Sequence, residues 1–286
     1  FNATVDAAKL SKLLTVKSNG ETKSVRVNTT QTAKTISIAI HNVDPKTDDR
    51  KLVFGVAKGI GSPGSTYVTD NVLRLEVEIP EIGISGRTYL SKGMLKEARE
   101  IAEKNTQAFA KTIPENAILI GIEPSAILSF RDEYPDLCRG DLKQKAKTFA
   151  SRAMLIEEFL AQELDEGRIS SDSFTENTER VRMHGHCFQK ALSSLVPLKK
   201  ILMLPKNYTV LNIPSGCCGM AGSFGYEKEH YNISMQIGEL ILFPTIRSEA
   251  EATLISASGT SCRHQISDGT NRKALHPVEI LYRGLK

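Results

Sequence analysis

The chain has 286 residues, of which 40% are apolar, and this is enough to bury the core of one large domain or of two ordinary ones. Its 37 basic and 33 acidic residues leave a net charge of only +4, and because Lys and Arg are scattered along the chain, nucleic-acid binding is not expected. No stretch approaches the roughly 18 consecutive apolar residues that a membrane-spanning helix needs, so a membrane span is not expected either.

The first 66 residues have the pattern of short strands. Apolar and polar residues alternate there with a period of two, which is typical of half-buried strands and a hairpin. Three stretches carry the signal: 24–30, 35–43 and 52–56. A Gly- and Pro-rich linker follows at 59–64. We therefore expect a β-rich segment of unknown role over residues 1–66 and a second domain over residues 67–286.

From about residue 71 onward, short apolar runs alternate with longer helical patterns. This order predicts an α/β fold with a largely parallel sheet. The expected strands are 73–79, 117–122, 181–184, 209–213 and 253–257. The expected helices are 91–110, 142–164, 188–195, 227–242 and one that begins after His276-Pro277.

Two short phrases of this region recur. The phrase 77–80 followed by Ser85-Gly86 matches 211–214 followed by Cys218-Gly219, and the phrase 120–126 matches 255–262. We therefore expect a duplicated fold of two α/β halves: a degenerate first half at about 71–165 and a metal-binding second half at about 180–286.

Four of the five cysteines lie in the second half: Cys187, Cys217, Cys218 and Cys262. An odd number of cysteines in a large domain, with two of them adjacent, argues against a disulfide framework. Each of the three cysteine positions follows a predicted strand, and open α/β sheets gather their binding loops at that edge. Soft thiolate sulfur selects iron–sulfur clusters, zinc or copper(I), so the pattern predicts a site for one of these metals.

The residues alone leave three interpretations of this site open. Four thiolates are the usual ligands of an iron–sulfur cluster, although the spacing differs from the common ferredoxin patterns. The same residues suit a structural zinc, with His184, His186 or His264 replacing one thiolate, and cysteines also occur simply as small buried residues. In the cluster interpretation, Gly219 lets the backbone approach the cofactor closely, and His184, His186 and His264 surround it and donate hydrogen bonds to its sulfurs.

These motifs are similar to a known family. The element 216–219 (Gly-Cys-Cys-Gly), with His-Gly-His-Cys187 before it and Cys262 after it, resembles the cysteine-rich CCG domain of heterodisulfide reductase subunits. The same domain occurs in the iron–sulfur subunits of glycolate oxidase and anaerobic glycerol-3-phosphate dehydrogenase. The phrases 85–93, 121–125 and 184–191 look closer to the carboxy-terminal module of fused proteins that join an FAD-linked 2-hydroxyacid dehydrogenase to an iron–sulfur module.

The resemblance implies an electron-transfer module of an FAD-linked oxidoreductase, which relays electrons from flavin to an acceptor. FAD and substrate would lie on a partner subunit or on a domain outside this sequence, so the chain alone would not oxidise a hydroxy acid. Its location would be the cytoplasm, or a membrane face reached through the partner.

This chain departs from the family pattern in three places. Ser85 and Ala126 stand where many relatives have cysteines, and Cys262 has no second cysteine three residues later. One four-thiolate cluster of the [4Fe–4S] kind, or zinc, is therefore expected in place of a five-thiolate cluster. The third departure is residues 1–66, which do not resemble the usual start of the module. Two rival functions remain: a zinc-stabilised docking module, and a thiol–disulfide reductase subunit that uses Cys217 or Cys218.

Overall fold

The computed structural model describes five strands between Leu14 and Glu78 and the residues 83–114 and 117–286. The chain divides into two compact units, Phe1–Glu81 and Ile82–Lys286. Each unit is described by itself below. The boundary expected near residue 66 lies outside the described residues.

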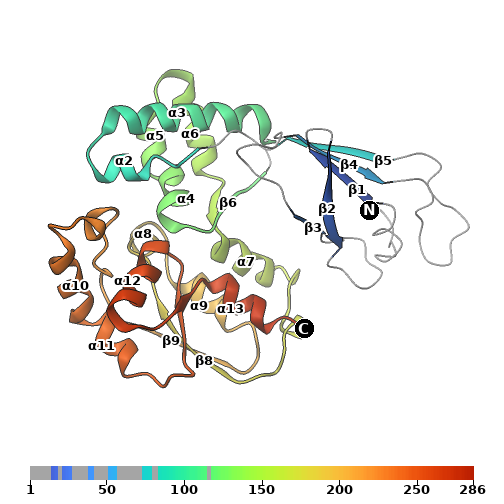
Figure 1. Ribbon diagram of the computed structural model, residues 1–286. Helices are drawn as coiled ribbons and strands as arrows, with labels where there is room; N and C mark the ends of the chain where they lie inside the picture. Colours follow the sequence, from blue (N-terminus) through green and yellow to red (C-terminus); the bar gives the residue numbers. More distant parts are fainter. Residues whose placement is uncertain are drawn as a thin grey trace, which may run out of the picture. The chain divides into compact units, whose positions relative to one another are not determined.

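The first unit contains a five-stranded antiparallel sheet with the order β3-β2-β1-β4-β5 (Figure 1). Its strands are β1 (Leu14–Ser18), β2 (Glu21–Val27), β3 (Ile38–His41), β4 (Lys51–Val56) and β5 (Leu73–Glu78). The strand expected at 73–79 is confirmed, but its expected place in the parallel sheet is wrong, because β5 pairs antiparallel with β4. Its alternation of apolar and charged residues is typical of an antiparallel strand, whereas buried parallel strands are apolar throughout.

The first half of the second unit is mainly helical and contains one pair of parallel strands. Its elements are α2 (Arg87–Ser91), α3 (Leu95–Thr112), β6 (Leu119–Gly121), α4 (Pro124–Arg131), α5 (Glu133–Leu137), α6 (Gly140–Ala150), β7 (Ala153–Leu155) and α7 (Ile156–Asp165). The single helix expected over 142–164 is wrong, because β7 separates α6 from α7. Ala153 and Leu155 are buried, and the pairing of β7 with β6 outweighs the local helical pattern.

The second half of the unit contains a parallel four-stranded sheet with the order β11-β10-β8-β9. Its strands are β8 (Glu179–His184), β9 (Tyr208–Asn212), β10 (Leu254–Ala257) and β11 (Ala274–Leu275). Its helices are α8 (Cys187–Leu192), α9 (Val196–Leu202), α10 (Tyr231–Leu240), α11 (Leu242–Arg247), α12 (Thr260–Thr270) and α13 (Pro277–Gly284), with short 3-10 turns η1 (Ser171–Ser173) and η2 (Phe224–Tyr226). The expected α/β class with parallel sheets is confirmed.

The two halves share an order of elements. In each, a strand, a loop and a helix lead to a second parallel strand and a final helix: β6 and α4 to β7 and α7, and β10 and α12 to β11 and α13. Both final helices begin with a capping box. Glu158 accepts a hydrogen bond from the backbone N–H of Leu155 at 2.9 Å, and Glu279 accepts one from that of His276 at 2.7 Å.

Hydrogen bonds join the strand-end loops of these two halves. The backbone N–H of Thr260 donates to Glu123 Oε2 at 2.8 Å, and the Ser258 hydroxyl donates to Glu157. His276 Nδ1 accepts from the backbone N–H of Val278, so its Nε2 carries the proton and donates to the carbonyl oxygen of Ile122 at 3.0 Å. The loop after β6 therefore faces the loop after β10.

Candidate metal centre

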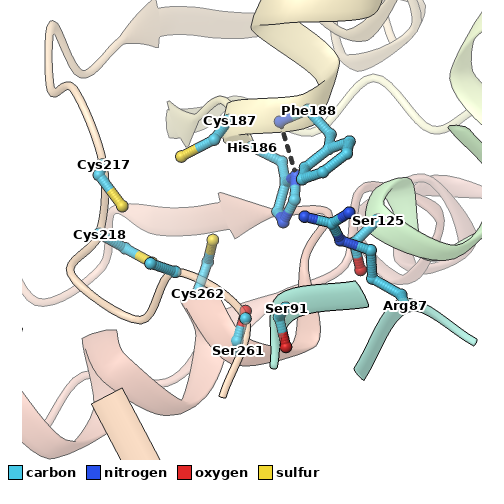
Figure 2. A pocket seen from close by; sticks show the side chains of 12 residues that line it. Arg87, Ser91, Ser125, His186, Cys187, Phe188, Cys217, Cys218, Ser261 and Cys262 are labelled. Carbon is cyan, nitrogen blue, oxygen red and sulfur yellow. Dashed lines mark hydrogen bonds between the residues drawn. The ribbon is translucent and has the colours of Figure 1, made fainter. Parts of the chain in front are cut away.

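Three loops at one edge of the parallel sheet carry the four thiols. Cys187 is the first residue of α8, just after β8, and Cys262 lies in the first turn of α12, just after β10. Cys217 and Cys218 lie in the loop that follows β9. Because β8, β9 and β10 are parallel neighbours, their carboxyl ends meet at the same edge. Figure 2 shows the thiol side chains grouped around one space.

These thiols line a cavity of about 450 Å³, which we call the thiol cavity. Its walls come from both halves of the unit: Arg87, Ser91 and Ser125 from the first half, and His186, Cys187, Phe188, Cys217, Cys218, Ala221, Gly222, Ser261 and Cys262 from the second. Cys218 and Cys262 are buried and Cys187 and Cys217 are partly exposed, so the cavity opens to solvent on one side of the thiol group.

The four thiols interact with one another as a chain of hydrogen bonds. The Cys187 and Cys218 thiols both donate to Cys217, which lowers the pKa of Cys217 far below its usual range and raises the pKa of each donor. Cys218 also interacts with Cys262, and this contact, followed by the nearby His184, lowers the pKa of Cys262. The sulfurs are thus close enough to share one metal centre, and two of them are stabilised as thiolates by their neighbours.

His184 and His186 place imidazole nitrogens at this site. His184 is fully buried, and its Nδ1 lies 2.8 Å from the Ser215 hydroxyl. Its Nε2 has no oxygen or nitrogen partner, and this atom lies with the Cys218 and Cys262 sulfurs in a group whose members are all within 4.8 Å of one another. An orphaned buried nitrogen beside soft sulfur fits zinc or an iron–sulfur cluster and does not fit a hard cation.

Two glycines let the loops approach the thiols. Gly219 has φ +106°, a Cβ built there would lie 2.2 Å from the carbonyl oxygen of Ser234, and its N–H donates to the Cys217 sulfur at 3.3 Å. A Cβ on Gly259 would lie 2.4 Å from the His186 ring. Both positions therefore require glycine for the loops to close around the site.

His264 lies apart from the other predicted site residues. Its side chain is exposed, its Nδ1 lies 2.9 Å from the Tyr226 hydroxyl, and it does not line the thiol cavity. The structure therefore brings together the four cysteines, His184, His186 and Gly219, and it leaves His264 on the outer face of α12.

Arg87 and Phe188 are site residues that the sequence patterns do not predict. The Arg87 guanidinium carbon lies 4.2 Å from the centroid of the Phe188 ring, and Arg87 forms an ion pair with Glu133. The phrase 85–93 carries a family resemblance, but nothing in the local sequence indicates that its arginine faces thiols a hundred residues later. Only the packing of α2 against the second half reveals the arrangement.

Fold and site together define the class: an α/β domain whose strand-end loops gather cysteines around a cavity. The chain is similar to D-2-hydroxyglutarate dehydrogenase of Haemophilus influenzae, with 26% identity over 71% of this chain and 20% of that protein. It is also similar to D-2-hydroxyglutarate dehydrogenase of Escherichia coli (26%; 71% and 19%). One subunit of the anaerobic glycerol-3-phosphate dehydrogenase of Escherichia coli, the C chain of that enzyme, is 28% identical over 70% of this chain and 49% of that protein.

These relatives are dehydrogenases or a dehydrogenase subunit, which confirms the expected similarity to oxidoreductases. The chain spans between about a fifth and a half of their lengths. No family model matches the chain, and no solved structure matches it. Within the described parts of the chain, no helix is both long and apolar enough to cross a membrane.

Proposed function

We propose that the second unit is the electron-transfer module of an FAD-linked dehydrogenase and that it holds an iron–sulfur cluster on Cys187, Cys217, Cys218 and Cys262. The observation that carries this proposal is the meeting of four free thiols from three loops at one cavity. When bound, such a cluster takes up and passes on single electrons. The similarity to dehydrogenases gives independent support.

The surroundings of the thiols favour a cluster over zinc. The ligands of a structural zinc close around the ion, usually as a tetrahedron. Here the thiols form one wall of a cavity of about 450 Å³, which leaves more space than a single ion fills. Four thiolates are also the usual ligands of [4Fe–4S] clusters.

The other residues of the site hold and tune the thiolates. Lys190 donates to the carbonyl oxygens of Ser215 and Gly216 and so fixes the loop that carries the adjacent cysteines. The imidazoles of His184 and His186 lie beside the sulfurs, where an N–H donor stabilises the more negative charge of the reduced state and raises the reduction potential.

The partner would be an FAD-binding dehydrogenase domain or subunit. Two of the relatives are named as whole D-2-hydroxyglutarate dehydrogenases of which the chain covers about a fifth, and a third is named as one subunit of an enzyme. We propose that flavin and a 2-hydroxy acid bind elsewhere in the same assembly. The assembly would work in the cytoplasm or at a membrane face through the partner.

Metal and sulfide analysis of protein purified without oxygen tests this proposal. We expect iron and acid-labile sulfide in near-equal amounts and a brown absorption that bleaches on reduction, all lost in Cys218→Ser. Cys138→Ser is the matched control and should keep the colour, because Cys138 is buried in the first half against Thr106. One zinc per chain without colour would contradict electron transfer and favour a docking module. Metal-free protein with a reactive Cys217 would favour thiol–disulfide chemistry instead.

A further inference from the structure

The thiol cavity has a second wall that the cysteines do not explain. Arg87 and Ser91 of α2 and Ser125 of α4 line it from the first half. A guanidinium group cannot ligate a soft metal, and hydroxyls are poor ligands for one. The volume of about 450 Å³ lies within the roughly 300–1,000 Å³ of small-molecule sites. This wall therefore has a role of its own.

Arg87 is fixed in place but retains free donors. Its guanidinium stacks on the Phe188 ring and is paired with Glu133, so its orientation is set from two sides. A guanidinium has five N–H donors. Among the residues that the structure describes, the Arg87 side chain donates to one acceptor only, Glu133. The other N–H groups remain available to a ligand in the cavity.

His186 presents a second donor to the same space. Its side chain is only 7% exposed, and its Nδ1 accepts a hydrogen bond from the backbone N–H of Phe188 at 3.1 Å. In the neutral ring the proton is therefore on Nε2. Figure 2 shows this edge of the ring facing the Arg87 guanidinium. Two donors that face each other lack an acceptor between them.

We propose that the thiol cavity binds a compact carboxylate beside the cysteines, with the carboxylate oxygens accepting hydrogen bonds from Arg87 and His186. One cation with a planar fork and one neutral donor suit a singly charged, planar carboxylate better than a doubly charged phosphate. The ring of Phe188 forms the apolar backing of the site. Ser91 and Ser125 mark the part of the cavity into which the rest of the ligand extends.

This site goes beyond the proposed function, because binding of the carboxylate uses no residue that ligates metal. If a cluster is present, the ligand is its neighbour in the cavity, and a negative charge there lowers the reduction potential. The two proposals can therefore fail separately. The iron and sulfide content tests one, and anion binding by the same sample tests the other.

Isothermal titration calorimetry tests the site. Acetate, oxalate and malonate are titrated into the wild-type chain at constant ionic strength, with inorganic phosphate for comparison and with the iron and sulfide content of each sample measured. We expect saturable binding of at least one carboxylate, weakened roughly tenfold or more in Arg87→Gln, because a hydrogen bond to a charged group contributes about 1.5–3 kcal/mol. Arg87→Lys keeps the charge but loses the fork, and binding should be weakened there too.

Arg247→Gln is the matched control. Arg247 also pairs with a glutamate, Glu239, and lies over an aromatic ring, that of Phe243, but it does not line the thiol cavity. Its substitution should leave carboxylate binding unchanged. Absence of saturable binding by the folded wild type overturns the proposal whether or not iron is present. Equal binding by Arg87→Gln, or tighter binding of phosphate than of any carboxylate, overturns it as well.

Discussion

The two halves of the second unit have the same order of strands and helices but different interiors. The first half is packed around aromatic rings, with Phe109 5.3 Å from Phe130 and 5.7 Å from Phe149 between ring centroids. In the second half, Cys218 and Cys262 are themselves members of a buried cluster. Each half nevertheless forms the strand-end loop that faces the other. The comparison teaches that the backbone arrangement does not require the thiols, so the fold and the metal site are separable.

The largest effect on stability is expected from the aromatic core of the first half. Phe109→Ala removes a side chain that is 2% exposed and contacts two other rings, and such a truncation costs about 3–5 kcal/mol. Denaturant unfolding measures the loss. Protein that remains folded should still bind metal, because Phe109 does not line the thiol cavity. Leu240→Ala, at a side chain that is 76% exposed, should change stability by no more than about 0.5 kcal/mol.

A loss of metal by folded Phe109→Ala would break the comparison, since it would mean that the core of one half controls the site of the other. A loss of stability as small as that of Leu240→Ala would show that the aromatic core contributes little.

A smaller effect is expected at the cysteine loop of the second half. Gly219→Ala forces φ +106° on a residue with a Cβ, costs about 1–3 kcal/mol for the backbone conformation alone, and creates a close contact with Ser234. We expect the metal content to fall together with the thermal midpoint. Gly216→Ala is the control in the same loop, because a Cβ there meets no atom within 4 Å. If both variants keep their metal equally, the left-handed turn is not needed to place the thiols.

The smallest effect concerns the contact between the halves. Burial raises the pKa of the Glu157 carboxyl above its ordinary value of 4.5, and the hydrogen bond from Ser258 only partly offsets this. The unfolded chain therefore loses this proton at a lower pH than the folded chain does. The stability that the neutral carboxyl contributes is complete below about pH 4.5 and decreases as the pH rises toward the folded pKa.

Glu157→Gln should remove this part of the pH dependence. Relative to the wild type, the variant should become more stable as the pH rises from about 4.5 to 8. Denaturant unfolding at several pH values measures the difference, with the exposed Glu229→Gln as control. Parallel pH profiles for wild type and Glu157→Gln would show that this carboxyl titrates alike in the folded and unfolded states.

Local sequence patterns predicted much of the second unit. The α/β class, the strands that became β6, β8, β9 and β10, and the helix after Pro277 follow from apolar runs and helix-start signals that lie within the elements themselves. The grouping of the cysteines was also predictable, because parallel strands bring the loops at their carboxyl ends together.

The features that could not be predicted depend on partners distant in sequence. The three-residue strand β7 exists because it pairs with β6, and β5 belongs to the antiparallel sheet because β4 covers its length. The same holds for Arg87, whose place opposite the thiols results from the packing of the two halves. A local pattern carries no information about which surface a short helix covers.

The spread of the cysteines over three loops also determines when metal can enter during synthesis. A nascent chain that has emerged as far as Cys218 holds three of the four proposed ligands, and Cys262 follows only after α10, α11 and β10. Amino-terminal regions generally fold first during synthesis, and the first half has a core of its own. Delivery of a cluster would then be a late step of maturation, carried out on a chain whose first half is already folded and forms the far wall of the cavity.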